Sequence, residues 1–383
     1  MLSKAMKGMF FILLAIFMSS AVYAQEVYKI GAIFSTTGPG SSLGIPEKNT
    51  AEMLEKEINA AGGINGHKVQ IIFYDDASDE TTARNRFNKL INEDKVSVVV
   101  GTTLSGTSLA LVDLANNAQI PLISCAASVK IVEPVAERKW IFKTPQSDVI
   151  VAQSIVKYLK SKKMTKVAII TVKNPFGASG KEQLEKLLPE AGISIVSKEE
   201  FNEKDTDTLV QLTKIKEANP QAVICWVTSP GAATVTRSMK IDLKMDTPLI
   251  MSHGVANKDY INLAGEAANG VVFPAGKLLV ANDLPNKDPQ KVLLVKYAKD
   301  YKAQYGQEPS TFGGHAWDAL KISFAAMKKV GNDSAKLRDE IGKTKKFAGT
   351  AGIFNFSPTD HNGLKEDCLV ITKIANGKWT LAK

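Results

Sequence analysis

Two short loops rich in hydroxyl side chains are the parts of this sequence best suited to bind a ligand. Residues 101–108 (GTTLSGTS) follow a run of valines and open a segment with helical spacing, and residues 124–128 (SCAAS) follow another apolar run. Hydroxyl donors together with free backbone N–H groups at the start of a helix suit an anion such as a carboxylate. Serine and threonine also cap helices without binding any ligand, so the sequence leaves both roles open.

The glycine-rich motifs do not have the spacing of a nucleotide site. Residues 38–44 (GPGSSLG) lie where a dinucleotide fingerprint would follow a strand, but Leu43 stands in place of its third glycine. Residues 177–181 lack the four-residue gap of a P-loop, and Glu182 stands where Ser or Thr would hold Mg²⁺. Neither a nucleophile–base set nor clustered metal ligands can be read from the spacing. We therefore expect no cofactor, no metal and no catalytic residues, and residues 38–44 remain a candidate ligand-contacting loop.

The charge and composition exclude other classes of protein. The 383 residues carry 48 Lys+Arg and 39 Asp+Glu, a formal net charge of +9, but basic and acidic residues alternate along the chain. A nucleic-acid-binding protein would cluster its basic residues, so no nucleic-acid partner is expected. The hydrophobic content of 44% is that of a globular chain, and the length suggests two or three domains.

The first 24 residues read as a secretory signal peptide. Lys4 and Lys7 precede an apolar run over residues 9–18, and residues 21–24 (AVYA) supply the small residues that a signal peptidase reads. The run is far shorter than the ~20 residues needed to span a bilayer. We expect an exported mature chain that begins at Gln25.

Behind the loops, β-rich runs alternate with segments of helical spacing. Strands are predicted at 27–34, 69–74, 96–100, 121–124, 166–172, 193–200, 222–227, 248–251 and 368–374. Helices are predicted at 46–61, 80–92, 106–117, 148–162, 177–190, 206–217, 231–242, 287–305 and 310–330. Continuous apolar strands that alternate with helices indicate right-handed βαβ units on parallel sheets. The pattern predicts an α/β protein with two doubly wound lobes that divide near Pro145, followed by a helical tail.

Several motifs of the mature chain stand in the order and spacing of a known family. They are residues 59–66 (NAAGGING), 75–76 (DD), the loop 101–108, 126–128 (AAS) and 254–257 (GVAN). In these the chain resembles the leucine/isoleucine/valine-binding proteins, the type I periplasmic substrate-binding components of ABC importers. The resemblance implies two lobes joined by three crossovers around a ligand cleft. Lobe one would be residues 26–144 plus 275–357, and lobe two residues 145–274 plus 358–383.

The resemblance also implies a role and partners. It implies a periplasmic monomer that is not an enzyme, captures a small carboxylate by lobe closure, and delivers it to an inner-membrane ABC permease with its ATPase subunits. Ser105 matches the serine that holds the ligand carboxylate, Phe176 a pocket tyrosine, and Phe312 a pocket aromatic on the far side. The implied ligand-binding residues are Leu43, Ser105, Ala126, Ser128, Phe176, Thr228, His253 and Phe312.

Two departures from the family pattern concern the ligand. His253 stands where amino-acid-binding members place the carboxylate that pairs with the ligand ammonium, and Thr228 or Ser229 replaces a tyrosine. A buried ammonium without a carboxylate costs several kcal/mol, and an imidazolium would repel it. Relatives that take up aromatic acids are similar in having Ser-His-Gly here. We therefore expect an aromatic or similar carboxylate that lacks an ammonium.

Other interpretations remain open. In one, His253 only packs beside the cleft, another acid such as Asp318 pairs with the ammonium, and the ligand is a branched-chain or related amino acid. In another, the chain is a periplasmic enzyme or a sensor domain on the same fold.

The family disulfide is missing because Ser78 and Leu104 occupy its positions. The three cysteines, Cys125, Cys225 and Cys368, are expected to be free and mostly buried.

Overall fold

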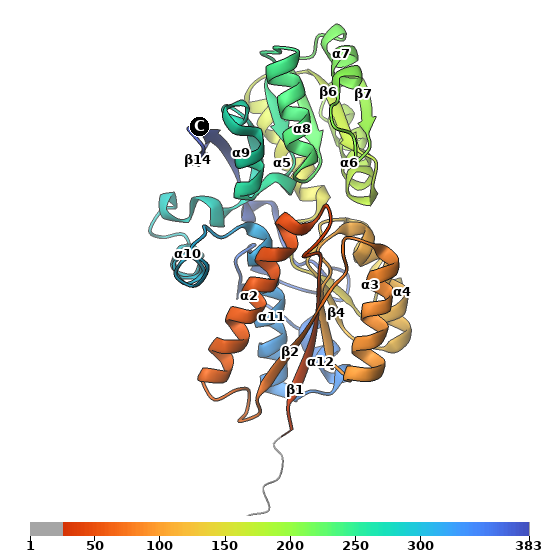
Figure 1. Ribbon diagram of the computed structural model, residues 1–383, viewed down its shortest axis with the longest axis vertical. Helices are drawn as coiled ribbons and strands as arrows, with labels where there is room; N and C mark the ends of the chain where they lie inside the picture. Colours follow the sequence, from red (N-terminus) through yellow and green to blue (C-terminus); the bar gives the residue numbers. More distant parts are fainter. Residues whose placement is uncertain (1–25, 383) are drawn as a thin grey trace, which may run out of the picture.

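Lobe one is built on a five-stranded parallel sheet with the strand order β2-β1-β3-β4-β5. The computed structural model describes residues 26–382, so the proposed signal peptide lies outside the described residues. The strands are β1 Tyr28–Phe34, β2 Val69–Asp75, β3 Val98–Gly101, β4 Leu122–Ser124 and β5 Ile141–Lys143. Helices α2 Ser41–Ala60 and α11 Thr311–Val330 cover one face, and α3 Glu80–Lys89 and α4 Ser105–Ala118 cover the other (Figure 1).

Lobe two holds a seven-stranded mixed sheet with the order β14-β13-β10-β9-β8-β6-β7. Its strands are β6 Lys166–Val172, β7 Ser194–Phe201, β8 Ala222–Trp226, β9 Leu249–Met251, β10 Val272–Gly276, β13 Leu369–Ala375 and β14 Lys378–Leu381. Strands β6 to β10 run parallel, whereas β13 and β14 are antiparallel additions at one edge. Its helices are α5 Asp148–Ser161, α6 Pro175–Glu190, α7 Leu209–Glu217, α8 Gly231–Arg237 and α9 Lys258–Ala264.

The apolar strands of lobe two are buried on both faces. Ile169 of β6 packs in one core cluster with side chains of α5 and α6, and the next residue, Ile170, packs in another cluster with side chains of α7, α8 and α9. Successive side chains of a strand point to opposite faces. The unbroken apolar runs of the sequence therefore reflect two covered faces, as expected for a parallel sheet. The prediction of two α/β lobes is confirmed. The predicted helical tail is wrong, because α11 packs against α2 in the core of lobe one and the chain ends in strands β13 and β14 of lobe two.

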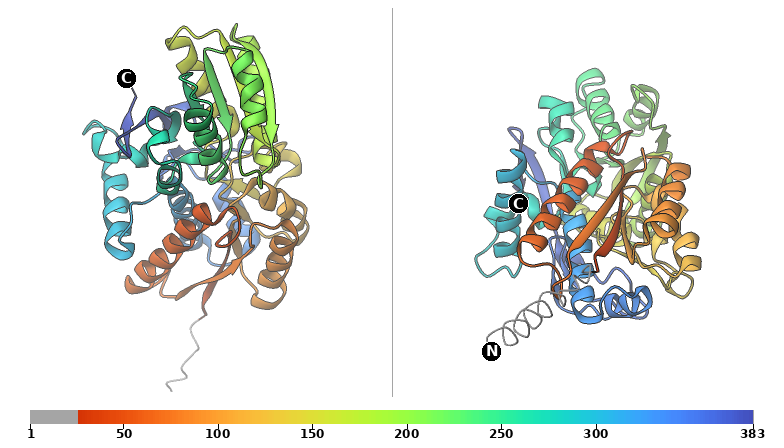
Figure 2. Two further views of the ribbon diagram at one scale, coloured as in Figure 1. Left: turned by 45° about the horizontal axis from the view of Figure 1, so that its top comes forward. Right: turned by 60° about the horizontal axis from the view of Figure 1, so that its bottom comes forward.

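The chain passes between the two sheets three times: after β5, after β10, and between β12 Ile353–Phe354 and β13. Hydrogen bonds tie the first crossover to lobe one and to the third crossover. Thr144 Oγ1 donates to the His315 carbonyl at 2.9 Å, Gln146 Nε2 to the Ala351 carbonyl at 2.8 Å, and Asn362 Nδ2 to the Pro145 carbonyl at 2.9 Å. Helix α10 Lys291–Tyr305 lies along the second crossover beside α2 (Figure 2). The residue boundaries given above for the two lobes stay a prediction.

Several elements differ from their predicted limits or were not predicted. Helix α2 begins at Ser41, not at residue 46, so Pro46 lies inside it and residues 41–44 form its first turn instead of a loop. The prediction placed the proline at the helix start because proline interrupts a helix interior. The sequence analysis also missed β5, β10, β14, α9 and the helix Ser334–Gly342. For β14 a signal was present, because Asn376-Gly377 before it is the strongest short hairpin signal. Both residues have positive φ, +50° and +70°, as a type I′ turn requires.

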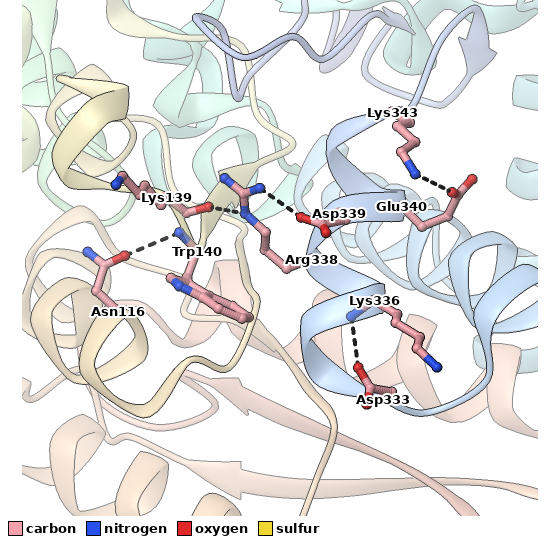
Figure 3. A network of polar contacts seen from close by, with 9 residues as sticks. All are labelled: Asn116, Lys139, Trp140, Asp333, Lys336, Arg338, Asp339, Glu340 and Lys343. Carbon is pink, nitrogen blue, oxygen red and sulfur yellow. Dashed lines mark hydrogen bonds and ion pairs between the residues drawn. The ribbon is translucent and has the colours of Figure 1, made fainter.

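On the surface of lobe one, α12 Ser334–Gly342 is tied to the segment that leads into β5 (Figure 3). Arg338 Nε donates to the Lys139 carbonyl at 2.8 Å, and its Nη1 pairs with Asp339 at 2.9 Å. The backbone N–H of Trp140 donates to Asn116 Oδ1 of α4 at 3.2 Å. These contacts hold the edge strand β5 between α4 and α12.

Three further findings concern the cysteines, metal-ligating side chains and membrane-spanning helices. Cys125, Cys225 and Cys368 are free and buried, as predicted, although Cys368 ends a short 3-10 turn, Glu366–Cys368, just before β13. Within residues 26–382, no group of His, Cys, Asp or Glu side chains is arranged to hold a metal ion. None of the helices in that range has the length and apolar character that a membrane crossing requires.

Candidate functional site

A cavity lies between the lobes where their strands end. Its empty volume is about 760 Å³, solvent at the mouth included. The residues that line it follow the carboxyl ends of strands β1 to β9 or belong to the start of α11. Open α/β sheets bind ligands at this edge.

Seven of the eight residues predicted to bind ligand line this one cavity. They are Leu43, Ser105, Ala126, Phe176, Thr228, His253 and Phe312. Sequence positions more than 260 residues apart, from Leu43 to Phe312, are thus brought together. Their binding role stays a prediction. The eighth residue, Ser128, does not line the cavity.

The lobe-one side of the cavity is formed by the start of α4. Ser105 is the first residue of this helix, and the preceding cap position is Leu104, whose side chain cannot cap. The N–H groups of the first turn are therefore left without a side-chain cap at the positive end of the helix dipole. Ser105 Oγ accepts a hydrogen bond from the Ser128 N–H at 3.3 Å, which leaves its own proton for another acceptor. Ser105 is thus not a helix cap, and the arrangement suits an anion.

The loop before α4 is held by close backbone packing and by buried hydroxyls. Gly101 has φ of +109°, and a Cβ atom there would lie 2.0 Å from the Ile33 carbonyl oxygen, so only glycine fits. Behind the loop, Thr102 and Thr107 share a hydrogen bond of 2.6 Å. Ser108 contacts Ser124 at 2.7 Å, which joins the loops that follow β3 and β4. These hydroxyls position the backbone and are not available to a ligand.

Several of the hydroxyls that line the cavity already donate hydrogen bonds to protein acceptors. Thr103 Oγ1 donates to Glu47 and accepts from the Ser35 N–H, and Ser78 Oγ donates to the Thr37 carbonyl. Burial raises the pKa of the Glu47 carboxyl well above its usual value. Among the cavity-lining hydroxyls of residues 26–382, those of Ser105 and Thr228 donate to no protein acceptor. Ser105 is therefore the cavity-lining hydroxyl of lobe one that has no protein acceptor among the described residues.

Ser128 joins the two lobes. Its hydroxyl accepts from the Lys130 N–H at 3.3 Å, which caps the short 3-10 turn Val129–Ile131, and donates to Ser179 Oγ of α6 at 3.0 Å. Lys130 Nζ also pairs with Glu182 of α6 at 2.6 Å. The capping alternative that the sequence left open describes the Ser128 hydroxyl, and its ligand contact stays a prediction.

The lobe-two side of the cavity is aromatic. The rings of Phe176 and His253 are 5.7 Å apart at an angle of 61°, and Trp226 packs behind them with centroids 5.9 Å from Phe176 and 6.1 Å from His253. Such tilted contacts are the preferred geometry of aromatic pairs. A Cβ on Gly254 would lie 2.5 Å from the Val227 carbonyl oxygen, so glycine permits the close approach of the β8 and β9 loops.

The sequence reasoning missed His315. This residue of α11 is 2% exposed and lines the cavity one turn after Phe312, with the two rings 6.1 Å apart. The signal was present, because residues three apart on a helix lie on the same face. Burial, together with Lys143, lowers the pKa of His253 to about 3. Burial and the neighbouring His253 hold the pKa of His315 well below its usual value. Both rings are neutral near pH 7.

Asp318, the acid considered for the ligand ammonium, does not line the cavity. Its carboxyl oxygens accept hydrogen bonds from the Thr350 N–H, from the Ala351 N–H at 2.8 Å, and from Thr350 Oγ1 at 3.1 Å. Burial raises its pKa to about 7. The carboxylates that do line the cavity among the described residues, Glu80 and Glu203, are solvent-exposed.

We predict that Asp318→Asn lowers the free energy of unfolding by about 1–2 kcal/mol and leaves ligand affinity unchanged. The asparagine NH₂ would face the backbone donors of residues 350 and 351, and a buried donor left unpaired costs this much. Urea denaturation and titration calorimetry of the same preparation measure the two quantities. A loss of affinity without a loss of stability would instead place Asp318 at the ligand.

Comparison with known proteins gives consistent matches over nearly the whole chain. A family model described as "Periplasmic binding protein" matches residues 27–378. A Leu/Ile/Val-binding protein homolog of Brucella melitensis is 27% identical over 345 residues, 89% of each chain. A leucine-, isoleucine-, valine-, threonine-, and alanine-binding protein of Pseudomonas aeruginosa is 25% identical over 335 residues, 87% of this chain and 86% of that one.

Solved structures match equally well. An extracellular ligand-binding receptor from Rhodopseudomonas palustris HaA2 superposes with a TM-score of 0.88 and 30% identity, and covers 94% of this chain and 100% of its own. The branched-chain amino acid transporter substrate-binding protein LivJ of Streptococcus pneumoniae, in complex with isoleucine, has a TM-score of 0.83 and 27% identity over 92% of this chain and 98% of its own.

Proposed function

This chain belongs to the periplasmic binding protein family, and from that premise we propose that it captures an aromatic or similar carboxylate that lacks an ammonium group. On this proposal the lobes close on the ligand in the periplasm, and the loaded protein delivers it to an inner-membrane ABC permease with its ATPase subunits. The protein acts as a monomer without catalysis, and residues 1–24 are its signal peptide. Its relatives are named as binding proteins.

The observation that carries the proposal is the neutral His253 in a cavity without a buried carboxylate among the described lining residues. The start of α4 can receive a ligand carboxylate through backbone N–H groups and Ser105. An ammonium in the same cavity would need a desolvated counter-charge, and leaving it unpaired costs several kcal/mol. A ligand whose only charged group is its carboxylate does not have this cost, because the rest of the molecule is uncharged. Phe176 and Phe312 supply apolar faces for a ring.

A branched-chain or related amino acid is the second candidate. The relatives whose names include a ligand favour it, since they are named for leucine, isoleucine and valine, and one structure holds isoleucine. Glu80 and Glu203 line the cavity from opposite lobes and are the acids that would have to pair with the ammonium. Both are solvent-exposed, so their attraction for an ammonium is weakened by water.

Thermal-shift screening of residues 25–383 against aromatic acids and amino acids tests the ligand class. A ligand that binds the folded state raises its stability in proportion to the logarithm of concentration over Kd. We expect aromatic acids to raise the melting temperature and leucine to leave it nearly unchanged. The reverse pattern would replace this proposal with the second candidate.

We also predict that ligand binding compacts the molecule. Ser128–Ser179 and Lys130–Glu182 are contacts between the two lobes, and hinge closure is the expected movement of such a fold. Small-angle scattering should show a smaller radius of gyration at saturating ligand than without ligand. An unchanged radius would contradict closure.

A further inference from the structure

The chain contains four asparagines that are each followed by a glycine, a dipeptide that is prone to lose the side-chain amide. The pairs are Asn65–Gly66, Asn269–Gly270, Asn362–Gly363 and Asn376–Gly377. Asparagine is chemically labile, and a following glycine has no Cβ atom to hinder attack by its backbone nitrogen. Since the local sequence is the same in all four pairs, the structure around each pair decides which of them reacts in the folded protein.

The reaction takes place within the chain. The glycine N–H loses its proton, its nitrogen forms a bond to Cγ of the asparagine, and the side-chain nitrogen leaves as ammonia. Water then opens the resulting succinimide at one of its two carbonyls, which yields aspartate or isoaspartate. Isoaspartate has an additional methylene in the backbone. The attacking nitrogen and the amide must approach each other closely, so hydrogen bonds that hold either group slow the reaction.

Two of the pairs are held at the attacking nitrogen. The Gly363 N–H donates to Asp360 Oδ1 at 2.8 Å, and Asn362 before it is buried. The Gly270 N–H donates to the Ile374 carbonyl at 2.9 Å. Neither nitrogen can attack until its hydrogen bond breaks, so both pairs are expected to react slowly in the folded protein.

The other two pairs form matched turns. Asn65 and Gly66 have φ of +53° and +85°, and Asn376 and Gly377 have φ of +50° and +70°. The first turn is tied to the body of lobe one, because Asn65 Nδ2 donates to the carbonyl of Lys328, in the last turn of α11, at 3.0 Å. Its amide is therefore restrained, although the side chain is exposed.

At the second turn neither reacting group is held. The Asn376 side chain is exposed, and within residues 26–382 neither this side chain nor the Gly377 N–H has a hydrogen-bond partner. The turn joins β13 to β14, which has four residues and is the outermost strand of the seven-stranded sheet (Figure 1). A short edge strand opens locally at a low cost in free energy, so this turn can reach the geometry of attack.

We propose that Asn376 is a site of spontaneous deamidation in the folded protein and that the other three Asn–Gly pairs are protected by their hydrogen bonds. The product isoaspartate would lengthen a two-residue turn whose geometry sets the register of the hairpin. Trp379 of β14 contacts the ammonium of Lys258, 5.7 Å from the ring centroid, and Lys258 Nζ donates to the Gly377 carbonyl at 2.5 Å. Deamidation should therefore weaken the attachment of β14 and lower the melting temperature.

The test compares deamidation rates in the folded and unfolded states. Residues 25–383 are incubated at mildly alkaline pH with and without urea, and peptide mass spectrometry with chromatographic separation of isoaspartate follows all four pairs. The ratio of the folded-state rate to the unfolded-state rate at each pair cancels intrinsic differences between the peptides. We expect this ratio to be about tenfold or more higher at Asn376 than at each of the other three asparagines.

Two variants connect the reaction to stability. Asn376→Gly keeps a residue that adopts positive φ and removes the reactive amide, so its melting temperature should stay constant during an incubation that lowers that of the original protein. Freshly prepared Asn376→Asp carries the charge of the products without the extra methylene, and Asp–Gly suits the same turn. Its melting temperature should be close to that of the original protein, which would assign the loss to isoaspartate.

The matched turn at residue 65 makes the result decisive. A rate ratio at Asn376 no higher than that at Asn65 would overturn the proposal, because the free turn and the tied turn would then react alike. The proposal also fails if Asn376 reacts in urea and stays intact in the folded protein. An equal fall in melting temperature in Asn376→Gly would overturn the assigned effect on β14. None of these outcomes depends on the ligand or on the proposed function.

Discussion

Replacement of Ser105 by alanine is expected to weaken binding of a carboxylate ligand by about 1.5–3 kcal/mol, roughly 10- to 150-fold in Kd. The ligand-free protein should lose a smaller amount of stability, because Ser105 Oγ also accepts a long hydrogen bond of 3.3 Å from the Ser128 N–H. The expected size is that of a hydrogen bond to a charged group, because the Ser105 hydroxyl has no protein acceptor and lies at the uncapped start of α4. Titration calorimetry and thermal melting of the same preparation measure both effects.

Ser78→Ala is the matched control for this prediction. Ser78 also lines the cavity, but its hydroxyl donates to the Thr37 carbonyl at 2.8 Å and accepts from the Gly40 N–H at 3.0 Å. The control should lose some stability and little affinity. If Ser105→Ala lowered the melting temperature while affinity stayed intact, Ser105 would be a structural residue and the anion would bind elsewhere.

The contrast between Ser105 and Ser128 shows what sequence reasoning can and cannot locate. Both serines lie in small-residue loops after apolar strands, and both loops reach the same sheet edge because parallel strands end there together. The location of the site therefore follows from the strand–helix pattern. The direction of each hydroxyl depends on the residue at which the following helix begins. Ser105 is the first residue of its helix, whereas Ser128 is the cap residue before a 3-10 turn. Sequence patterns rarely define helix ends to that accuracy.

His315 and Asp318 illustrate the same limit within one helix. They are three residues apart on α11 and both buried, yet His315 lines the cavity while Asp318 binds the backbone of residues 350 and 351. The partner of Asp318 lies more than 30 residues away in sequence and carries no motif. Periodicity identified α11 as a helix with a buried face. Only the packing of residues 350 and 351, just before β12, against that face determines that Asp318 is hydrogen-bonded to protein while His315 lines the cavity.

The largest expected difference concerns the class of ligand. We predict that the mature protein binds an aromatic acid at least about 100-fold more tightly than leucine, isoleucine or valine. An ammonium transferred from water into this cavity would meet the neutral rings of His253 and His315, and the cationic Lys143 lies near both of them. A buried, unpaired charge costs several kcal/mol, and about 1.4 kcal/mol corresponds to a tenfold change in affinity. Calorimetric titration with benzoate, cinnamate and the three amino acids measures the difference.

His253→Glu provides the reciprocal experiment. A carboxylate at this position would repel the ligand's own carboxylate and supply the counter-charge that an ammonium lacks, so aromatic-acid affinity should fall and leucine affinity should rise. The matched variant His253→Gln has a similar size and no charge, so it should weaken the acid less and should not improve leucine. A swap in preference in the Glu variant alone would assign ligand class to the charge at residue 253. Submicromolar leucine binding by the unmodified protein, without response to any aromatic acid, would contradict the prediction and would require Glu80 or Glu203 to pair with the ammonium.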